Sequence, residues 1–190
     1  MRPKDESKRE AILQSAMVLI NTYGLAHTSI SKIAKEAGVS PATIYIYFAN
    51  KEDLLTTLYV EVRREMAGAI LDSIDESLEV VDAFRLLWEN LLAYYLAYPD
   101  HFVFAEQFNN SPIVDSVDPA DVDTHFEPYV RLIERGQALG QLKEIPANLI
   151  NAFVFYPLTE LAKHHVKAGT PMEDDELEAA FDCAWDAIRA

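Results

Sequence analysis

The sequence predicts an all-α protein of about nine helices, with a small N-terminal module followed by a larger C-terminal body. Two observations support this. Apolar residues recur at helical spacing along most of the 190 residues, and no stretch has the alternating pattern of a convincing strand. Residues that start or stop helices, chiefly Gly, Pro, Ser and Asn, divide the pattern into separate segments.

The N-terminal module contains three predicted helices. The first ends at Gly24, where a glycine after the last apolar residue is a common helix stop. Thr28 or Ser29 caps the short second helix. Ser40 caps the third, and Pro41 occupies its first position, where a missing N–H has no consequence.

A fourth helix, capped by Asn50, is predicted to continue to about Ile74. It links a module of residues 1–50 to a body of residues 51–190. Prolines separate the further helices of the body. These are predicted near Val80–Tyr98, His101–Asn109, Asp121–Ala138, Ala147–Lys167 and Glu173–Arg189.

Charge is distributed unevenly between the two parts. The formal net charge is −15, yet residues 1–51 carry seven basic and four acidic side chains. Residues 65–190 carry seven basic and 24 acidic side chains. This asymmetry predicts two modules with different partners.

Several classes of protein are excluded by the sequence. A single cysteine, Cys183, rules out a disulfide framework or a multi-thiolate zinc site, and among alanines it is expected to be a buried small residue. Neither a secretory signal nor a membrane span is recognisable, so we expect a soluble cytoplasmic protein without a membrane partner. No HExxH, Glu-x-x-His or glycine-rich phosphate loop occurs, so neither an enzyme, a metal site nor a cofactor is predicted.

The segment SISKIAKEAGVSPATIYIYF predicts a helix-turn-helix. Two short helices are joined by a tight turn in which Gly38 supplies a left-handed backbone and Val39 fills the crossing. Ile33, Ile44 and Phe48 provide a small core that fixes the crossing angle. This geometry suits a helix that enters the major groove of DNA.

The longer stretch TSISKIAKEAGVSPATIYIYFANKEDLL resembles the DNA-binding signature of the TetR family of bacterial transcriptional regulators, and the resemblance covers residues 8–60. It implies a homodimeric repressor whose third helix reads a two-fold symmetric DNA operator and whose body binds a small inducer. By motif position, Thr28 and Lys51 are implied to contact phosphates. The implied groove-facing residues are Pro41, Ala42, Thr43, Tyr45 and Tyr47.

The chemistry of the third helix favours phosphate positioning over base reading. Between Pro41 and Phe48 there is no Arg, Lys, Asn or Gln that could form bidentate hydrogen bonds with guanine or adenine. Readout is expected from apolar contacts with thymine methyls and from hydroxyls, Ser40 among them, whereas Ile46 is expected to face solvent or packing. The positive rim for phosphates comprises Lys32, Lys35 and Lys51, with Lys4, Lys8 and Arg9 on the arm. The alternative for Tyr45 and Tyr47 is that they pack within the protein and do not face the groove.

The last two helices are expected to form the dimer interface as a four-helix bundle with those of a second subunit, which is the arrangement that the family resemblance favours. Intramolecular core is the alternative. The interface residues are Ile150, Val154, Leu158, Leu161, Leu177, Ala180, Phe181, Ala184 and Ile188.

The effector site is expected where aromatic residues and a few polar groups share the helices of the body. An acidic, aromatic cavity favours an apolar ligand that is neutral or cationic. The alternative is that these residues are ordinary core, with His164 as a partner of Glu160. The candidates are Phe102, Phe108, Asn109, Phe126, Tyr129, Phe153, Tyr156, Glu160 and His164.

Two other functions remain open at this point. The body is alternatively a dimerisation or protein-docking module without a small-molecule ligand. A helical binding protein or enzyme with a vestigial N-terminal module is the other alternative, because the recognition helix lacks strong base-reading side chains.

Overall fold

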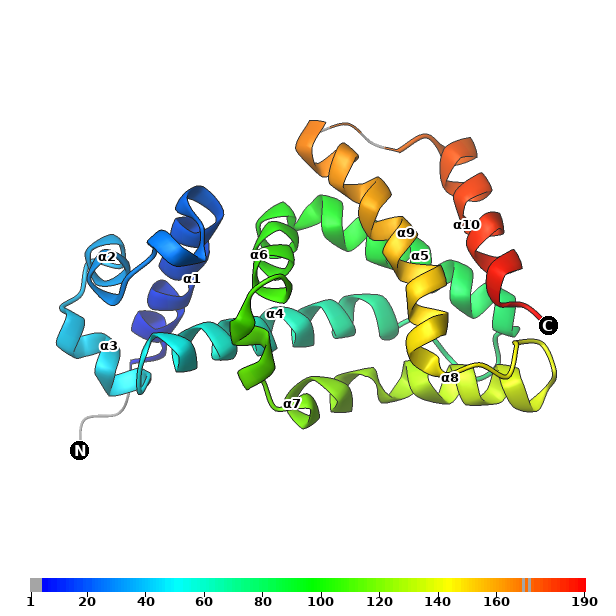
Figure 1. Cartoon of the computed structure of the whole chain (residues 1–190), viewed down its shortest axis with the longest axis horizontal. Coiled ribbons are helices and arrows are strands. Elements are labelled where there is room, and N and C mark those ends of the chain that lie inside the picture. The colour runs from blue at the N-terminus through cyan, green and yellow to red at the C-terminus, as the bar shows by residue number, and fades with distance from the viewer. Residues whose placement is uncertain (1–4, 169, 171) are drawn as a thin grey trace. The chain divides into compact units, whose positions relative to one another are not determined.

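The computed structural model of the chain describes residues 5–168, 170 and 172–190, and these residues are mostly helical (Figure 1). They fall into two compact units. The first consists of the described residues up to Arg63 together with Asp100–Asp121, and the second of Arg64–Pro99 with the described part of Val122–Ala190. The predicted boundary at residue 50 therefore differs from the division by compactness, which adds residues 51–63 and 100–121 to the helix-turn-helix.

The first unit contains the helix-turn-helix, the beginning of the fourth helix and a helix from later in the chain. Its elements are α1 (Glu6–Tyr23), η1 (Leu25–His27), α2 (Ile30–Glu36), α3 (Pro41–Tyr47), the first part of α4 (Lys51–Leu71), α6 (Pro99–Asn109) and η2 (Pro112–Ser116).

The core of the helix-turn-helix is formed by apolar side chains from all three of its helices. Ile12 and Ile20 of α1, Ile33 of α2 and Ile44 of α3 are each 0% exposed, and Phe48 is 3% exposed. Burying large apolar side chains of this kind stabilises the fold by roughly 1.5–3 kcal/mol each. This packing fixes the orientation of α3, and so it also fixes where the exposed side of that helix points.

The second unit is built around α5, which packs against α8, α9 and α10. Its elements are the end of α4, α5 (Val80–Ala97), η3 (Thr124–Phe126), α8 (Glu127–Ala138), α9 (Ala147–Ala168) and α10 (Asp174–Ile188), while α7 (Pro119–Asp123) crosses the boundary between the units.

Trp88 of α5 lies at the centre of the second unit's core. Its indole N–H donates to the carbonyl of Val154 in α9 at 2.7 Å, and its ring meets that of Phe181 in α10 edge-on, with centroids 5.6 Å apart. A buried indole needs such a hydrogen-bond partner. Close approach also matters at Gly136, because a Cβ there would lie 2.6 Å from Cδ1 of Leu142.

One predicted helix is divided in the structure. The sequence pattern predicts a single helix over residues 121–138, whereas the chain forms α7, η3 and α8 in succession. The physical reason is Pro128, which has no N–H to donate to the carbonyl of Thr124, so α8 begins with Pro128 in its first turn. The fourth helix is shorter than predicted, since α4 ends at Leu71.

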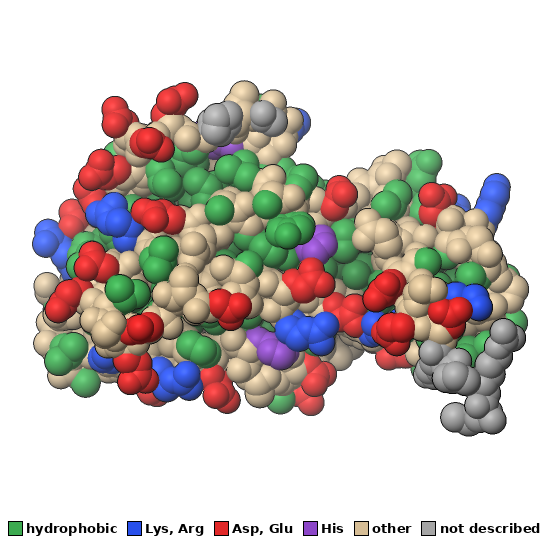
Figure 2. All heavy atoms as spheres, turned by 180° about the vertical axis from the view of Figure 1, so that it is seen from behind, with side chains coloured by type: hydrophobic (Ala, Val, Ile, Leu, Met, Phe, Trp, Pro, Cys, Tyr) green, Lys and Arg blue, Asp and Glu red, His purple; other side chains and the backbone are tan. Residues whose placement is uncertain are grey.

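Two surface properties follow from the helices that the structure describes. None of these helices has the length and apolar character needed to cross a membrane. Figure 2 shows one face of the molecule, where Asp and Glu side chains are spread over the surface and not gathered into a single patch.

Candidate nucleic-acid interface

The turn between α2 and α3 is held by backbone hydrogen bonds. The Val39 N–H donates to the carbonyl of Ala34 at 2.9 Å, and Gly38 has a φ of +66°, which glycine adopts without steric penalty. The hydroxyl of Ser40 then accepts a hydrogen bond from the Thr43 N–H at 3.2 Å, so the first turn of α3 is capped. The predicted helix-turn-helix is therefore formed as a short, rigid unit.

Helix α3 has a buried side and an exposed side. Ile44 and Phe48 point into the core, whereas Tyr45 is 57% exposed and Ile46 61% exposed. Ala42 is also exposed and lies three and four residues before them, which places all three on one helix face. We call this surface the recognition face, and it comprises Pro41, Ala42, Tyr45 and Ile46.

Tyr47, which the family motif implies to face the groove, is bonded within the first unit. Its hydroxyl donates to the backbone carbonyl of Asp5 and accepts from the Asp5 N–H, both at 3.1 Å. Its side chain is half-buried, and so is that of Thr43, whose hydroxyl is hydrogen-bonded to that of Ser40 at 2.9 Å. Of the two tyrosines, Tyr45 is therefore the exposed one. Ile46 faces solvent, which is one of the two environments that the sequence analysis expects for it.

Thr28 does not offer a hydroxyl to a phosphate in this structure. It is 3% exposed, and its hydroxyl donates to the carbonyl of Gly24 at 3.0 Å. A buried hydroxyl needs such a partner. In this structure Thr28 closes the turn between α1 and α2, and its implied phosphate contact stays a prediction.

Three lysines surround the helix-turn-helix. Lys32 and Lys35 are exposed, and the Lys32 ammonium donates to the carbonyl of His27 at 2.7 Å. Lys51 is half-buried, donates to the carbonyl of Leu25 at 2.7 Å, and has its pKa lowered by burial. All three ammonium groups can meet phosphates, but Lys51 also holds the turn before α2.

The basic residues of the N-terminal arm are partly neutralised by carboxylates. Lys8 pairs with Asp5 at 3.0 Å, and Arg9 pairs with Glu61 of α4. Lys4 lies outside the described residues. The positive rim is therefore concentrated on α2 and at the start of α4.

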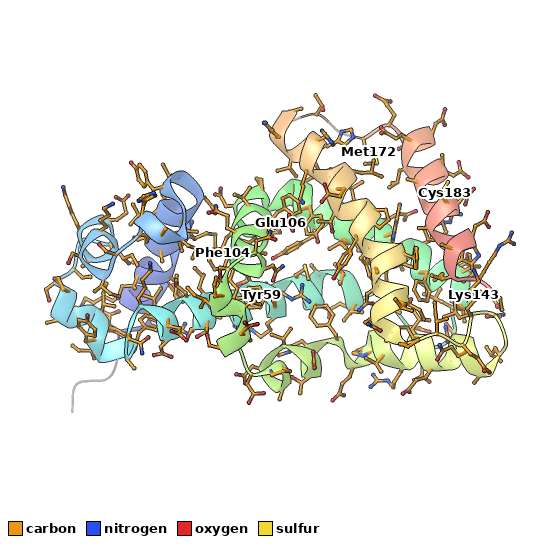
Figure 3. The ribbon with its side chains drawn as sticks, in the orientation of Figure 1. Tyr59, Phe104, Glu106, Lys143, Met172 and Cys183 are labelled. Atoms are coloured by element: carbon orange, nitrogen blue, oxygen red, sulfur yellow. The ribbon has the colours of Figure 1, made fainter. Side chains whose placement is uncertain are left out.

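Helix α6 packs against the helix-turn-helix and the first part of α4 (Figure 3). The rings of Tyr59 and Phe108 stack with centroids 4.4 Å apart, and the Tyr59 hydroxyl donates to Oδ1 of Asn109 at 2.8 Å. Burial raises the pKa of Tyr59. The Gln107 side chain adds a bond to the carbonyl of Ile20 at 3.2 Å. Sequence reasoning missed this attachment, because nothing in a helical pattern shows which distant helix it contacts.

Three of the predicted effector residues therefore lie on α6, in the first unit. Phe108 is 0% exposed and Phe102 5% exposed, while Asn109 accepts the bond from Tyr59. Two others belong to the second unit. Tyr129 is 7% exposed and donates to Oδ1 of Asn151 at 2.6 Å, with its pKa raised by burial, and Phe126 packs partly buried against the same core.

The remaining effector candidates share an exposed side of α9. Phe153 is 51% exposed and Tyr156 67% exposed, and both Glu160 and His164 are exposed. They do not line an interior wall of the second unit. Glu160 forms an ion pair with Lys163 at 2.5 Å. We call this surface the outer face of α9, and it comprises Leu149, Phe153, Tyr156, Glu160 and His164.

The residues predicted for the dimer interface lie mostly in the subunit's own core. Four of them lie on α9 and five on α10, and their side chains pack in or against the core among α5, α9 and α10. The buried members are Ile150, Val154, Leu158, Phe181, Ala184 and Ile188, and the partly buried ones are Leu161, Leu177 and Ala180.

The outward side of α10 is polar and small. Cys183 is exposed there, contrary to the sequence expectation, because Phe181 and Ala184 occupy the buried side of the helix (Figure 3). Among the residues that the structure describes, no group of His, Cys, Asp or Glu could hold a metal ion.

A capped helix-turn-helix with an exposed recognition face and adjacent lysines defines the chain as a DNA-binding transcription regulator of the helix-turn-helix class. Comparison with known families makes this more specific. Residues 12–58 match the model described as bacterial regulatory proteins, tetR family, and residues 80–189 match the one described as tetracyclin repressor-like, C-terminal domain. The chain belongs to the TetR family.

Known relatives agree with this assignment. A TetR family transcription regulator from Marinobacter aquaeolei VT8 superposes with a TM-score of 0.84 at 32% identity, over 100% of this chain and 99% of that one. An uncharacterized HTH-type transcriptional regulator of Haemophilus influenzae is 23% identical over 100% of both chains. Nucleoid occlusion factor SlmA of Vibrio cholerae is 27% identical over 76% of both. The family and the first two of these relatives are described as regulators, and not as enzymes.

Proposed function

We propose that the chain is a ligand-responsive transcriptional repressor that binds a two-fold symmetric DNA operator as a homodimer and is released by a small effector. The observation that carries this proposal is the recognition face, an exposed apolar surface on a helix that a turn and a cap hold rigidly. Large exposed apolar side chains next to lysines need a partner that is both apolar and anionic, and the major groove offers thymine methyls between phosphates.

The proposed division of labour at the operator follows from the placement of each side chain. Ala42, Tyr45 and Ile46 contact base edges and thymine methyls, and Ile46 takes the role that the motif implies for Tyr47. Lys32 and Lys51 contact phosphates, which position the helix without reading sequence. Sequence preference then depends on two symmetric half-sites.

For the dimer we propose the outer face of α9 together with the outward side of α10. Leu149, Phe153 and Tyr156 are 43%, 51% and 67% exposed, an unusual concentration of apolar surface on one helix. The small Ala179 and Cys183 on the outward side of α10 permit close approach of a second copy. This retains the predicted pair of helices but uses their opposite sides.

For the effector we propose an apolar, neutral or cationic molecule bound beside Tyr129. The Tyr129–Asn151 hydrogen bond is a polar pair within an aromatic cluster, because Tyr129 lies edge-on to Phe84 and Phe155 with centroids 6.0 and 5.3 Å apart. Apolar walls with a few polar groups are typical of small-molecule sites. Asn151 is the group that a ligand would engage.

The test is selection of operators from random duplex DNA with the purified protein at low and moderate salt. A two-fold symmetric site enriched at both salt concentrations supports the proposal. The control is the same selection with the Tyr45→Ala/Ile46→Ala variant, which should enrich no site. Absence of any enriched site with the parent protein would contradict the proposal and favour a vestigial helix-turn-helix.

A second function has one observation in its favour. SlmA is named as a nucleoid occlusion factor, and the exposed outer face of α9 also suits a protein partner. In this alternative the chain binds DNA but its body docks a protein and senses no small molecule. A screen of apolar amines and neutral compounds against the operator complex discriminates the two, since only the first function predicts a compound that releases the DNA.

A further inference from the structure

The first unit contains an open cleft of about 660 Å³, which is within the range of ~300–1,000 Å³ typical of small-molecule sites. It lies between η1 and the start of α4 on one side and the end of α6 with η2 on the other. The proposed effector site beside Tyr129 shares no residue with this cleft. The residues that line it are Leu25, Ala26, Lys51, Glu106, Gln107, Asn110, Ser111, Pro112 and Ile113.

Lys51 is the one basic residue among those that line the cleft. Among the ion pairs between described residues, none includes Lys51. Burial alone lowers the pKa of Lys51, whereas a carboxylate close to the ammonium would raise it. The bond to the Leu25 carbonyl uses one of the three ammonium hydrogens. A partly buried cation that keeps two hydrogens to donate favours an anion in the cleft.

The polar side chains on the α6 side of the cleft already have partners within the protein. Glu106, labelled in Figure 3, interacts with another group of the protein, so we assign it no contact with a ligand. Gln107 and Asn110 each donate one amide hydrogen to a backbone carbonyl, that of Ile20 at 3.2 Å and that of Glu106 at 2.7 Å. Each of these two amides has a second hydrogen to donate. This side of the wall therefore offers further hydrogen-bond donors to an anion.

The rest of the wall is mostly apolar and comes from both sides of the cleft. Leu25 and Ala26 belong to η1, and Pro112 and Ile113 belong to η2. Leu25 and Ile113 are half-buried, so part of each side chain remains open to the cleft. An apolar molecule between η1 and η2 would remove this surface from water, which is favourable roughly in proportion to the area buried.

We propose that this cleft binds an apolar monocarboxylate, of which a straight-chain alkanoate is the simplest example. The carboxylate accepts hydrogen bonds from Lys51 and from a side-chain amide, and the alkyl chain lies between the apolar residues of η1 and η2. An inorganic anion would leave the apolar surface in water, and a neutral alkyl compound would leave the ammonium without an anion. The monocarboxylate satisfies both features of the wall. It is a second ligand, distinct from the neutral or cationic effector proposed beside Tyr129.

This site has a consequence for DNA binding, and that consequence rests on the proposed function. The Lys51 ammonium is also the group that we propose to contact a DNA phosphate. A carboxylate in the cleft and a phosphate of the operator therefore compete for it. The alkanoate should weaken operator affinity without occupying a site in the second unit.

The direct test is isothermal titration calorimetry of the full chain with octanoate, octanol and butyrate. Octanol lacks the carboxylate, and butyrate lacks half of the carbon chain. We expect octanoate to bind and octanol to bind at least about tenfold more weakly, as for loss of a charge-assisted hydrogen bond. Butyrate should also bind at least about tenfold more weakly, because each buried methylene strengthens binding by up to about fourfold. Equal binding of octanoate and either other compound, or no binding of octanoate at millimolar concentration, would overturn the proposal.

The charged end of the site is tested by substitution of Lys51. In Lys51→Met, octanoate should bind no better than octanol binds to the parent. Lys143→Met is the matched control, because Lys143 also donates to a backbone carbonyl, that of Ala187 at 2.7 Å, but does not line the cleft. An octanoate affinity that is unchanged in Lys51→Met would overturn the assignment of the carboxylate.

The apolar wall is tested by a variant that leaves the bond between Lys51 and Leu25 intact. In Ile113→Gln the preference for octanoate over butyrate should fall, because the alkyl chain loses part of its apolar contact. Val117→Gln is the control, since Val117 is half-buried at the end of η2 and does not line the cleft. The same preference in Ile113→Gln as in the parent would overturn the placement of the alkyl chain.

The two proposals fail separately. If the parent protein enriches no operator but binds octanoate with the expected preferences, the proposed repressor function is contradicted and the cleft assignment stands. If it binds an operator but not octanoate, the reverse holds. If it binds both and octanoate leaves operator affinity unchanged, the competition at Lys51 is contradicted.

Discussion

Polar side chains near the turns of the helix-turn-helix are engaged within the subunit. Thr28, Ser40 and Tyr47 each bond a backbone group of the first unit, and Lys51 holds the carbonyl of Leu25. A motif position alone does not distinguish a side chain that contacts DNA from one that positions the contacting helix. Substitution of these residues distinguishes the two roles. Loss of a hydroxyl that positions the helix lowers the free energy of unfolding, whereas loss of one that contacts DNA lowers operator affinity.

Thr28→Val is expected to lower the free energy of unfolding by about 1–3 kcal/mol, because the part-buried hydrogen bond from the Thr28 hydroxyl to the Gly24 carbonyl is lost. Thr22→Val is the control, since the Thr22 hydroxyl also bonds a carbonyl, that of Val18 at 2.7 Å, but is exposed to water. Urea denaturation of both variants gives the comparison. Equal stability of the two, with operator affinity lost only in Thr28→Val, would contradict the structural role.

The pKa of Tyr129, raised by burial, predicts a loss of stability at alkaline pH. Below the unfolded-state pKa of about 10 the phenol is neutral in both states. Above it the unfolded chain ionises while the folded one does not, so unfolding becomes more favourable as the pH rises. In Tyr129→Phe the alkaline loss should be smaller than in the parent, whereas the exposed Tyr156→Phe should retain it. Urea denaturation at pH 8 and pH 10.5 tests this, and identical pH dependence of the two variants would contradict it.

At the scale of helices, α9 shows what periodicity alone leaves undetermined. Two apolar stripes run along it, one through Val154 and Leu158 and the other through Phe153 and Tyr156. The sequence predicts both stripes but not which of them packs inside the subunit. Contacts with α5 and α10 decide this, and they are set by residues such as Trp88 and Phe181 that lie far away in the sequence.

The same limit explains most of what could and could not be predicted. Helices with strong caps, such as α3 after Ser40, are placed within a residue or two, because their signals are local. The position of α6 in the first unit depends on Tyr59 and Gln107 meeting distant partners, which no local pattern shows. The division of the predicted helix over residues 121–138 was missed, although the missing N–H of Pro128 is a local signal for it.

Phe153→Asp is expected to dissociate the proposed dimer, because it places a charge on the apolar part of the outer face of α9. Leu139→Asp is the matched control, since Leu139 is 62% exposed at the end of α8 and is not one of the residues of this face. Sedimentation equilibrium should give a dimer for the parent and the control and a monomer for Phe153→Asp. A dimer that persists in Phe153→Asp would place the interface elsewhere.

At the scale of the whole molecule, a slightly basic N-terminal module is joined to a strongly acidic remainder. The acidic residues repel DNA beyond the local contact, so operator affinity should fall only gently with salt. We expect a dependence corresponding to about 3–5 phosphates neutralised per subunit, and Lys32→Met should reduce the slope by about one phosphate per subunit. Lys167→Met, an exposed lysine of α9, should leave it unchanged. Equal slopes for the parent and Lys32→Met would remove Lys32 from the interface.

The most direct test of the account is the operator affinity of Tyr45→Ala/Ile46→Ala compared with that of Tyr47→Phe. If the recognition face reads DNA, the double variant loses about 1–3 kcal/mol of binding free energy per subunit. Tyr47→Phe should keep its operator affinity while losing stability through the Asp5 bond. Unchanged affinity of the double variant, or a larger loss in Tyr47→Phe, would contradict the assignment of this face to DNA.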